Sequence, residues 1–154
     1  MDVILGRERT EKSQVIKQAD VVALLGLLPG EFAGDTGAAN FDTYLPRCSH
    51  GSSLSRAMHE LVAARLGRSE LALNFLRQTS AIDLADTHAS LDGGVHIASL
   101  GGVWMITVLG FAGLTVLPDA LAIDPQLPAG PHWNLPVNGA VACSTFVSIK
   151  PRTA

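Results

Sequence analysis

The chain has 154 residues, which fits one ordinary domain, and hydrophobic residues make up 47% of it. Charged residues make up only 16%, against about 25% in a typical soluble domain, so we expect a large buried apolar surface. The formal charge of -3, with 11 basic and 14 acidic residues and no basic cluster, argues against a nucleic-acid partner. Cys48 and Cys143 lie too far apart for a paired metal knuckle, and we expect both to be reduced.

The N-terminal third predicts a helix that begins after Ser13 and continues through residues 21–28. Residues 21–28 are apolar on every side, so this helix is expected to be buried all round until the following Pro-Gly pair ends it. Residues 34–40 are small and polar, and residues 41–50 follow neither a helical nor a strand period, so both segments are expected to be irregular. Charged residues near the N-terminus stand where a signal peptide would have its apolar core, and this predicts a cytoplasmic location.

Three further helices are predicted. The first begins at Ser53 or Ser55 and ends at Gly67, because serine caps helix N-termini and glycine favours the C-terminal end. The next begins at Ser69, and the short connection predicts that the two form a tight antiparallel hairpin. The last begins near His96.

Residues 97–118 contain no charged side chain and are numerous enough to nominate a membrane-spanning helix. Four glycines interrupt the segment, and no lysine or arginine lies near either end to anchor it. A buried core helix is therefore the preferred interpretation, and no membrane partner is expected.

Beyond the last helix the pattern changes to short strands. Residues 114–117 and 120–123 flank a Pro-Asp turn, and the Asn-Gly pair at 138–139 is typical of a second hairpin turn. The predicted fold class is mainly α with a C-terminal β segment, divided into residues 1–113 and 114–154.

Two predicted helix N-termini combine small residues with polar side chains: residues 50–55 and residues 93–96. A helix N-terminus offers unpaired N–H groups and the positive end of the helix dipole, which suit an anion. Ser52, Ser53 and His96 would add directed donors, so an oxyanion or phosphate pocket is predicted if the two ends meet. The competing interpretation is that the serines only cap a helix and that His96 satisfies a core contact.

Lys17 and Gln18 form a second candidate site, because polar side chains at the entrance of a buried helix must meet a polar partner or water. A cluster of sugar hydroxyls would satisfy both side chains. The alternative is a solvated first turn.

No metal or cofactor site is predicted. One group resembles a metal site in composition, but its spacing fits no helix or strand. It consists of Asp83, Asp86, His88 and Asp92. His59 and His132 receive no role, and no Asp or Glu stands in a clearly apolar setting that would give it the pKa of a general acid, so no catalytic residue is assigned.

Five segments form an ordered set of motifs. They are Val15-Ile16-Lys17-Gln18-Ala19-Asp20-Val21-Val22; Pro46-Arg47 with His50-Gly51-Ser52-Ser53-Leu54-Ser55; Val62-Ala63-Ala64-Arg65-Leu66-Gly67; Ile82-Asp83-Leu84; and Gly93-Gly94-Val95-His96-Ile97-Ala98 with Trp104. In order and spacing they resemble glycoside hydrolase family 65, the family of maltose, trehalose and kojibiose phosphorylases. The resemblance runs from about residue 3 to about residue 128.

This resemblance implies the last helices of an (α/α)6 barrel followed by the start of a small β domain. It also implies that Lys17 and Gln18 bind the glucosyl unit, while Ser52, Ser53 and His96 hold inorganic phosphate, the co-substrate. In the family's inverting reaction, phosphate attacks the anomeric carbon of an α-linked glucose disaccharide. A glutamic acid protonates the leaving oxygen, and β-glucose 1-phosphate is formed.

That glutamic acid belongs to a Gly-Pro-Asp-Glu-Tyr type motif, which is not present in this sequence. We therefore expect a C-terminal part of such an enzyme, inactive by itself, with apolar flanks that a second copy or upstream chain would cover. Hydrolases of the family lose the phosphate ligands, so the two serines and the histidine favour a phosphorylase. A family hydrolase and a non-catalytic remnant that binds sugar phosphate or a partner chain are the alternatives.

Overall fold

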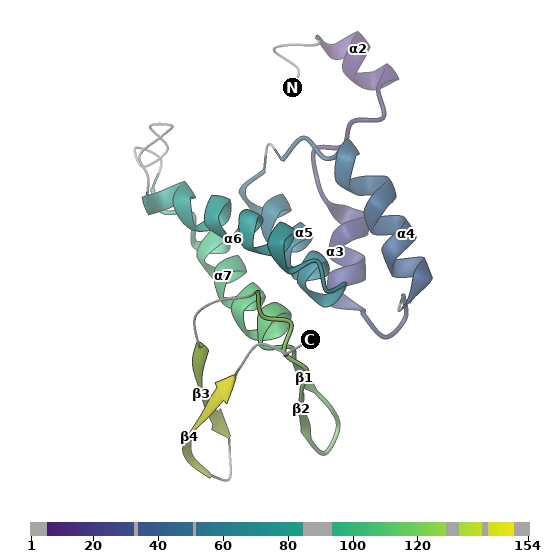
Figure 1. Ribbon diagram of the computed structural model, residues 1–154. Coiled ribbons are helices and arrows are strands. Elements are labelled where there is room, and N and C mark those ends of the chain that lie inside the picture. Colours follow the sequence, from purple (N-terminus) through teal and green to yellow (C-terminus); the bar gives the residue numbers. More distant parts are fainter. Residues whose placement is uncertain are drawn as a thin grey trace.

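The computed structural model describes residues 6–32, 34–50, 52–84 and 94–128, together with the backbone of 133–139 and 142–149. The helical elements are α2 (Arg7–Lys12), α3 (Asp20–Leu27), α4 (Asp35–Tyr44), the short η1 (Leu45–Arg47), α5 (Ser53–Arg65), α6 (Ser69–Leu84), α7 (Ile97–Met105) and the π-helical η3 (Ile106–Phe111). Two hairpins follow, β1 (Leu114–Val116) with β2 (Leu121–Ile123) and β3 (Trp133–Gly139) with β4 (Ala142–Ile149). The predicted fold class, mainly α with a C-terminal β segment, is confirmed (Figure 1).

The central helix of the body is α5, which contacts α3, α6, α7 and η3 (Figure 1). It buries Ser55, Ala57 and every residue from 59 to 64, so side chains on all its faces are covered. The predicted hairpin of α5 and α6 is confirmed. Gly67 makes the turn between them with a φ of +71°, which few other residues adopt.

The helices α5 and α7 pack closely and run in the same direction. A methyl group added at Gly102 of α7 would lie 2.6 Å from the Cβ of Ala57, and one added at Gly110 of η3, which continues α7, would lie 3.2 Å from the Cβ of Ala64. The contact points advance together along both sequences, so the two helices are parallel. Their N-termini therefore lie at the same end of the body.

The segment before α3 differs from the predicted helix after Ser13. The helix α2 ends at Lys12, and the chain then follows the segment that leads to α5. The N–H of Ile16 donates to the carbonyl of Arg47 at 2.9 Å, and the carbonyl of Ile16 accepts the N–H of Ser49 at 3.0 Å. These bonds hold the segment extended, so the helix begins only at Asp20.

Burial of residues 21–28 on every side was also a wrong prediction. The helix α3 buries Val22, Leu25 and Gly26, but it exposes Leu24 and Leu27. Leu28, which caps the C-terminus of this helix, is exposed as well. The cause is that α3 packs against α5 and α4 on part of its circumference.

A second difference is α4, which forms where irregular structure was predicted. Its sequence lacks an apolar period, but Phe41 is fully buried and anchors it to the core. Gly37 approaches the chain so closely that a Cβ there would lie 2.4 Å from the carbonyl oxygen of Phe32. Tertiary packing, and not an apolar period in the sequence, therefore stabilises this helix.

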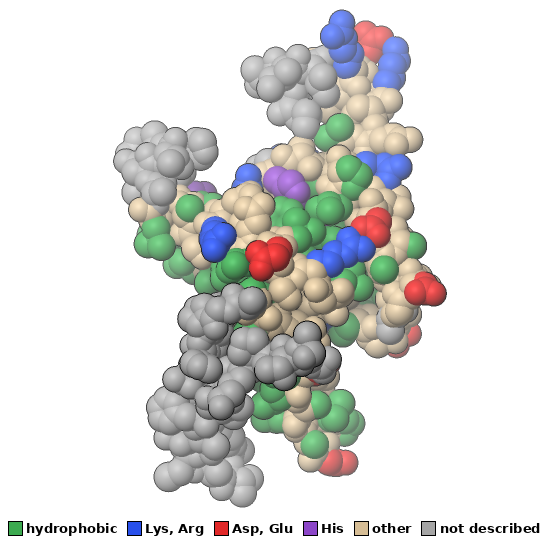
Figure 2. Space-filling view, viewed as in Figure 1, with side chains coloured by type: hydrophobic (Ala, Val, Ile, Leu, Met, Phe, Trp, Pro, Cys, Tyr) green, Lys and Arg blue, Asp and Glu red, His purple; other side chains and the backbone are tan. Residues whose placement is uncertain are grey.

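The apolar segment 97–118 divides into α7, η3 and the strand β1. Within the described ranges, no helix is both long and apolar enough to cross a membrane. The expected core burial holds for Ile106 and Phe111 of η3, whereas Ile97 and Trp104 of α7 are exposed. Figure 2 shows apolar side chains reaching the surface of the helical body.

The first hairpin has the predicted turn, since the N–H of Leu117 donates to the carbonyl of Ala120 across Pro118-Asp119. The second does not turn at Asn138-Gly139. Its register shifts after Val137, and Gly139 still pairs with Ala142, so residues 138–139 belong to the end of β3.

Candidate functional site

The two serines predicted to bind phosphate, Ser52 and Ser53, lie at the N-terminus of α5. Ser52 is the N-cap, in an extended conformation, and its Oγ accepts the N–H of Leu54 at 3.3 Å. Ser52 therefore caps the helix, and this leaves it able to act as a ligand as well, because the hydroxyl hydrogen is not used by that bond. Ser53 is the first helical residue.

The N-terminus of α7 is built around His96, its N-cap. Both carboxylate oxygens of Asp83 are engaged by this residue: Oδ2 accepts the backbone N–H at 2.9 Å, and Oδ1 lies 2.7 Å from Nδ1. The Asp83 side chain is 8% exposed and that of His96 is 33% exposed. Because the carboxylate accepts from Nδ1, it orients the ring and leaves Nε2 as the atom for a ligand.

The two N-termini meet at their first turns. The hydroxyl of Ser99, in the first turn of α7, lies 3.4 Å from the carbonyl of Ser53 and donates to it. Since α5 and α7 are parallel, the positive ends of both helix dipoles lie at this end of the body. An anion held there would meet both fields and the side chains around them.

The candidate sugar ligands lie beside the same end of α5. Ile16 pairs with Cys48, so the next residues, Lys17 and Gln18, follow the segment that leads to Ser52. Both are exposed. Gln18 lines a cavity of about 250 Å³ together with residues near the N-terminal ends of α5 and α3. The other lining residues are Ala19, Asp20, Ala23, Leu54, Ser55 and Met58.

The acidic group that resembles a metal site is divided by the structure. Asp83 holds His96, as described above. The remaining members, Asp86, His88 and Asp92, lie outside the described residues, as do the motif glycines Gly51 and Gly93.

A buried carboxyl was missed by the sequence analysis. Glu60 is completely buried, and burial raises its pKa to about 9. Neither of its carboxyl oxygens has a hydrogen-bond partner among the described residues. The expectation that no Asp or Glu stands in an apolar setting is therefore wrong. Glu60 is seven residues along α5 from Ser53, about 10 Å at the helical rise of about 1.5 Å per residue, so it cannot act on the same bound group.

Two histidines pack against each other near the N-terminus of α5, which the sequence did not indicate. His59 is completely buried in α5, and the ring of His50 packs edge-on against it with 4.6 Å between ring centroids. The ring of Phe75 of α6 packs at a tilt against both rings. Burial lowers the pKa of His59 and lowers that of His50 to about 4, so both rings are neutral near pH 7. Their long-range packing leaves no signal in a single sequence.

The chain is similar to known proteins of one family over most of its length. A family model described as the glycosyl hydrolase family 65 central catalytic domain matches residues 4–105. The chain is 44% identical over 116 residues to a kojibiose phosphorylase of Halothermothrix orenii. The aligned region covers 75% of this chain and 15% of that protein. It is 43% identical over 123 residues to a kojibiose phosphorylase of Escherichia coli, which covers 79% and 16% respectively.

A solved structure of a candidate kojibiose phosphorylase from the human microbiome superposes with a TM-score of 0.67 at 36% identity. The superposition covers 72% of this chain and 15% of that one. The chain thus spans about 15% of the length of these proteins. Its mainly helical fold agrees with a portion of an (α/α)6 barrel.

Proposed function

The chain belongs to glycosyl hydrolase family 65, and from this membership we propose that it carries the phosphate and glucosyl ligands of an inverting α-glucoside phosphorylase. A phosphate oxygen bonds to the anomeric carbon of an α-linked glucose disaccharide while the glycosidic C–O bond breaks. The leaving oxygen takes a proton from a general acid, and β-glucose 1-phosphate and the second sugar are released. The relatives named as kojibiose phosphorylases favour phosphorolysis over hydrolysis.

The observation that carries the proposal is the meeting of the N-termini of α5 and α7 at the Ser99–Ser53 hydrogen bond. Phosphate would accept the hydroxyl hydrogens of Ser52 and Ser53 and lie at the positive ends of both helices. The ring of His96, oriented by Asp83, would bind it through Nε2. A protonated ring would donate a charge-assisted bond, which is stronger than a neutral one.

Lys17 and Gln18 are the proposed ligands of the glucosyl unit. The position of Gln18 in a cavity beside the first turn of α5 supports this role, because the sugar and the attacking phosphate must lie side by side. Hydroxyl groups of the sugar would accept from the Lys17 ammonium and exchange hydrogen bonds with the Gln18 amide.

We assign the general acid to sequence outside these 154 residues, and we divide the chain into a barrel portion, 1–113, and a β portion, 114–154. Protonation of a leaving group commonly contributes about 10² to 10⁴ in rate. The chain alone should therefore release no detectable glucose 1-phosphate. A protein partner, either upstream sequence or a second copy, would cover the exposed apolar side chains of α3 and α7.

Calorimetric titration of the chain with inorganic phosphate tests the proposed site. His96→Ala should weaken phosphate binding about ten- to a hundredfold, because it removes a bond worth about 1.5 to 3 kcal/mol. Lys17→Ala is the matched control, since it removes a cation assigned to the sugar. Equal phosphate affinity of His96→Ala and the original chain, with both folded by circular dichroism, would contradict the proposal.

A further inference from the structure

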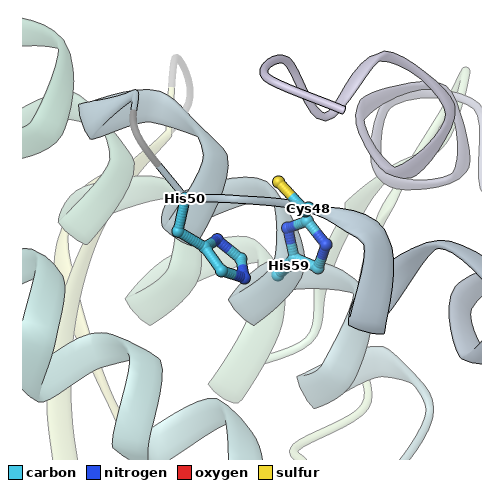
Figure 3. A group of neighbouring side chains, drawn as sticks. All are labelled: Cys48, His50 and His59. Atoms are coloured by element: carbon cyan, nitrogen blue, oxygen red, sulfur yellow. The ribbon is translucent and has the colours of Figure 1, made fainter. Parts of the chain in front are cut away.

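Three side chains with metal-binding atoms gather behind the N-terminus of α5. Cys48 and His50 come from the segment before this helix, and His59 comes from its second turn (Figure 3). One ligand atom from each lies within 4.8 Å of the other two. Cys48 is 8% exposed and His59 is not exposed at all. None of the three is a ligand in the proposed phosphorylase site.

The hydrogen bond of His59 shows which of its two ring nitrogens carries the hydrogen. Its Nδ1 lies 2.7 Å from the carbonyl oxygen of Ser55, and a carbonyl can only accept, so Nδ1 donates. In the neutral ring Nε2 then carries a lone pair. This atom is buried and has no hydrogen-bond partner in the part of the chain that the structure describes.

The same reasoning applies to His50. The hydroxyl of Ser55 donates to the carbonyl of Ser52 at 2.9 Å, so its single hydrogen is already used. The Ser55 oxygen must therefore accept from Nδ1 of His50, which lies 3.3 Å away. The Nε2 of His50 is left with a lone pair as well. One residue, Ser55, thus orients both rings through its carbonyl and its hydroxyl.

This pattern is typical of histidines that bind a metal, where one ring nitrogen coordinates the ion and the other donates to a carbonyl or another acceptor. An ordinary core histidine has a hydrogen-bond partner for each buried nitrogen. His59 lacks one of them, which is costly unless a further group occupies the site.

The backbone adds an independent observation. His50 has a φ of +49°, and it is the one non-glycine residue with a positive φ in the described part of the chain. Such a conformation is unfavourable for a residue with a side chain, and it persists mainly where function requires it. It occurs here at the residue whose ring meets His59.

We propose that Cys48, His50 and His59 bind one Zn²⁺ ion through the Cys48 sulfur and the Nε2 atoms of the two histidines, with a water molecule as fourth ligand. A thiol and two imidazoles are a ligand set that suits Zn²⁺ and does not suit Mg²⁺ or Ca²⁺. The thiol gives its proton to solvent on binding, and the ion stays Zn²⁺ throughout. Tetrahedral bonds of about 2.0 to 2.3 Å place ligand atoms roughly 3.5 Å apart, so ligand atoms that now lie within 4.8 Å of one another would close by at most about 1 Å.

The ion would join the segment before α5 to α5 itself and so hold the N-terminus that carries Ser52 and Ser53. No metal site was predicted from the sequence, where Cys48 was weighed only as half of a knuckle with Cys143. The ligand spacing, Cys-x-His followed by a histidine nine residues later, is unlike a paired knuckle and becomes visible only in the fold.

Cobalt(II) is a suitable probe, because its visible spectrum reports four-coordinate geometry and a thiolate ligand adds a near-ultraviolet charge-transfer band. The metal-free 154-residue chain is titrated with Co²⁺ in a reducing, phosphate-free buffer, and Zn²⁺ is then added. We expect both spectral features to saturate at one equivalent and to disappear as Zn²⁺ displaces Co²⁺.

Cys48→Ser should remove the charge-transfer band and weaken Co²⁺ binding at least about tenfold, whereas Cys143→Ser, the matched control, should change neither. Ser55→Ala tests the orienting role and should weaken binding about ten- to a hundredfold, the usual range for residues that orient a ligand. His59→Gln should abolish binding, with His132→Gln as its control. Circular dichroism checks that each variant is folded.

Two outcomes would overturn the site. One is a folded original chain that gives no four-coordinate Co²⁺ spectrum. The other is a spectrum and an affinity that stay unchanged in Cys48→Ser. Because Cys48→Ser replaces one small side chain by another, it keeps the test decisive even if loss of the buried His59 unfolds the chain.

Discussion

In α3 and in α5, the burial of the side chains differs from what the polarity of the sequence suggests. The sequence of α3 is almost wholly apolar, yet Leu24 is 42% exposed and Leu27 is 62% exposed. The sequence of α5 contains serine, arginine, histidine and glutamate, yet residues 59–64 are all buried. Burial follows the number of neighbouring elements: α5 contacts α3, α6, α7 and η3, while α3 packs mainly on α5 and α4.

The comparison predicts that the same substitution costs much more stability in α5 than in α3. Leu61→Ala in α5 should lower the free energy of unfolding by about 2 to 5 kcal/mol, because it leaves a cavity at a fully buried position. Leu27→Ala in α3 should change it by no more than about 0.5 kcal/mol. Urea denaturation of both variants measures the contrast, and similar losses would show that α3 is as buried as α5.

Neighbouring glycines in α7 test how closely this helix approaches α5. Gly102→Ala should destabilise the chain by about 1 to 3 kcal/mol, because the added methyl group would lie 2.6 Å from the Cβ of Ala57. Gly101→Ala is the matched control, with no atom within 4 Å of its added Cβ. It should stabilise the helix by about 0.5 to 1 kcal/mol. Thermal unfolding compares them, and a destabilising Gly101→Ala together with a neutral Gly102→Ala would refute the packing.

Glu60 makes the stability of the α5 core depend on pH. Its pKa is raised from 4.5 to about 9, so between these values the unfolded chain loses a proton that the folded chain retains. Stability should therefore fall as pH rises through this range, by about 1.4 kcal/mol per pH unit from this group. Glu60→Gln should remove that slope. Urea denaturation in EDTA between about pH 5 and pH 9 tests this, and parallel profiles for the two chains would contradict it.

Local signals predicted much of the helical body. Ser52 caps α5, Gly67 ends the turn after it, and α6 begins at Ser69, as the cap and turn chemistry of those residues indicates. The helix α4 could not be predicted, because the buried Phe41 and the close approach of Gly37 to residue 32 are tertiary contacts. The exposure of α3 was not predicted, because the hydropathy of a segment does not indicate how many other elements pack against it.

The candidate site divides in the same way. Ser52, Ser53 and His96 were recognised because small and polar residues before a helix have a known chemistry. The roles assigned to these residues stay predictions. The bond of Asp83 to His96 was not predicted, because the two residues are thirteen positions apart. The burial of Glu60 was missed because it depends on the elements that pack around α5.

The central claim is that the parallel N-termini of α5 and α7 act on one phosphate, and nuclear magnetic resonance tests it most directly. Inorganic phosphate is added to the ¹⁵N-labelled chain while the amides of Ser52 and Ser53 and the ring of His96 are followed. The account predicts that all three shift with a single dissociation constant. Shifts of the serines without His96, or with a different dissociation constant, would contradict it.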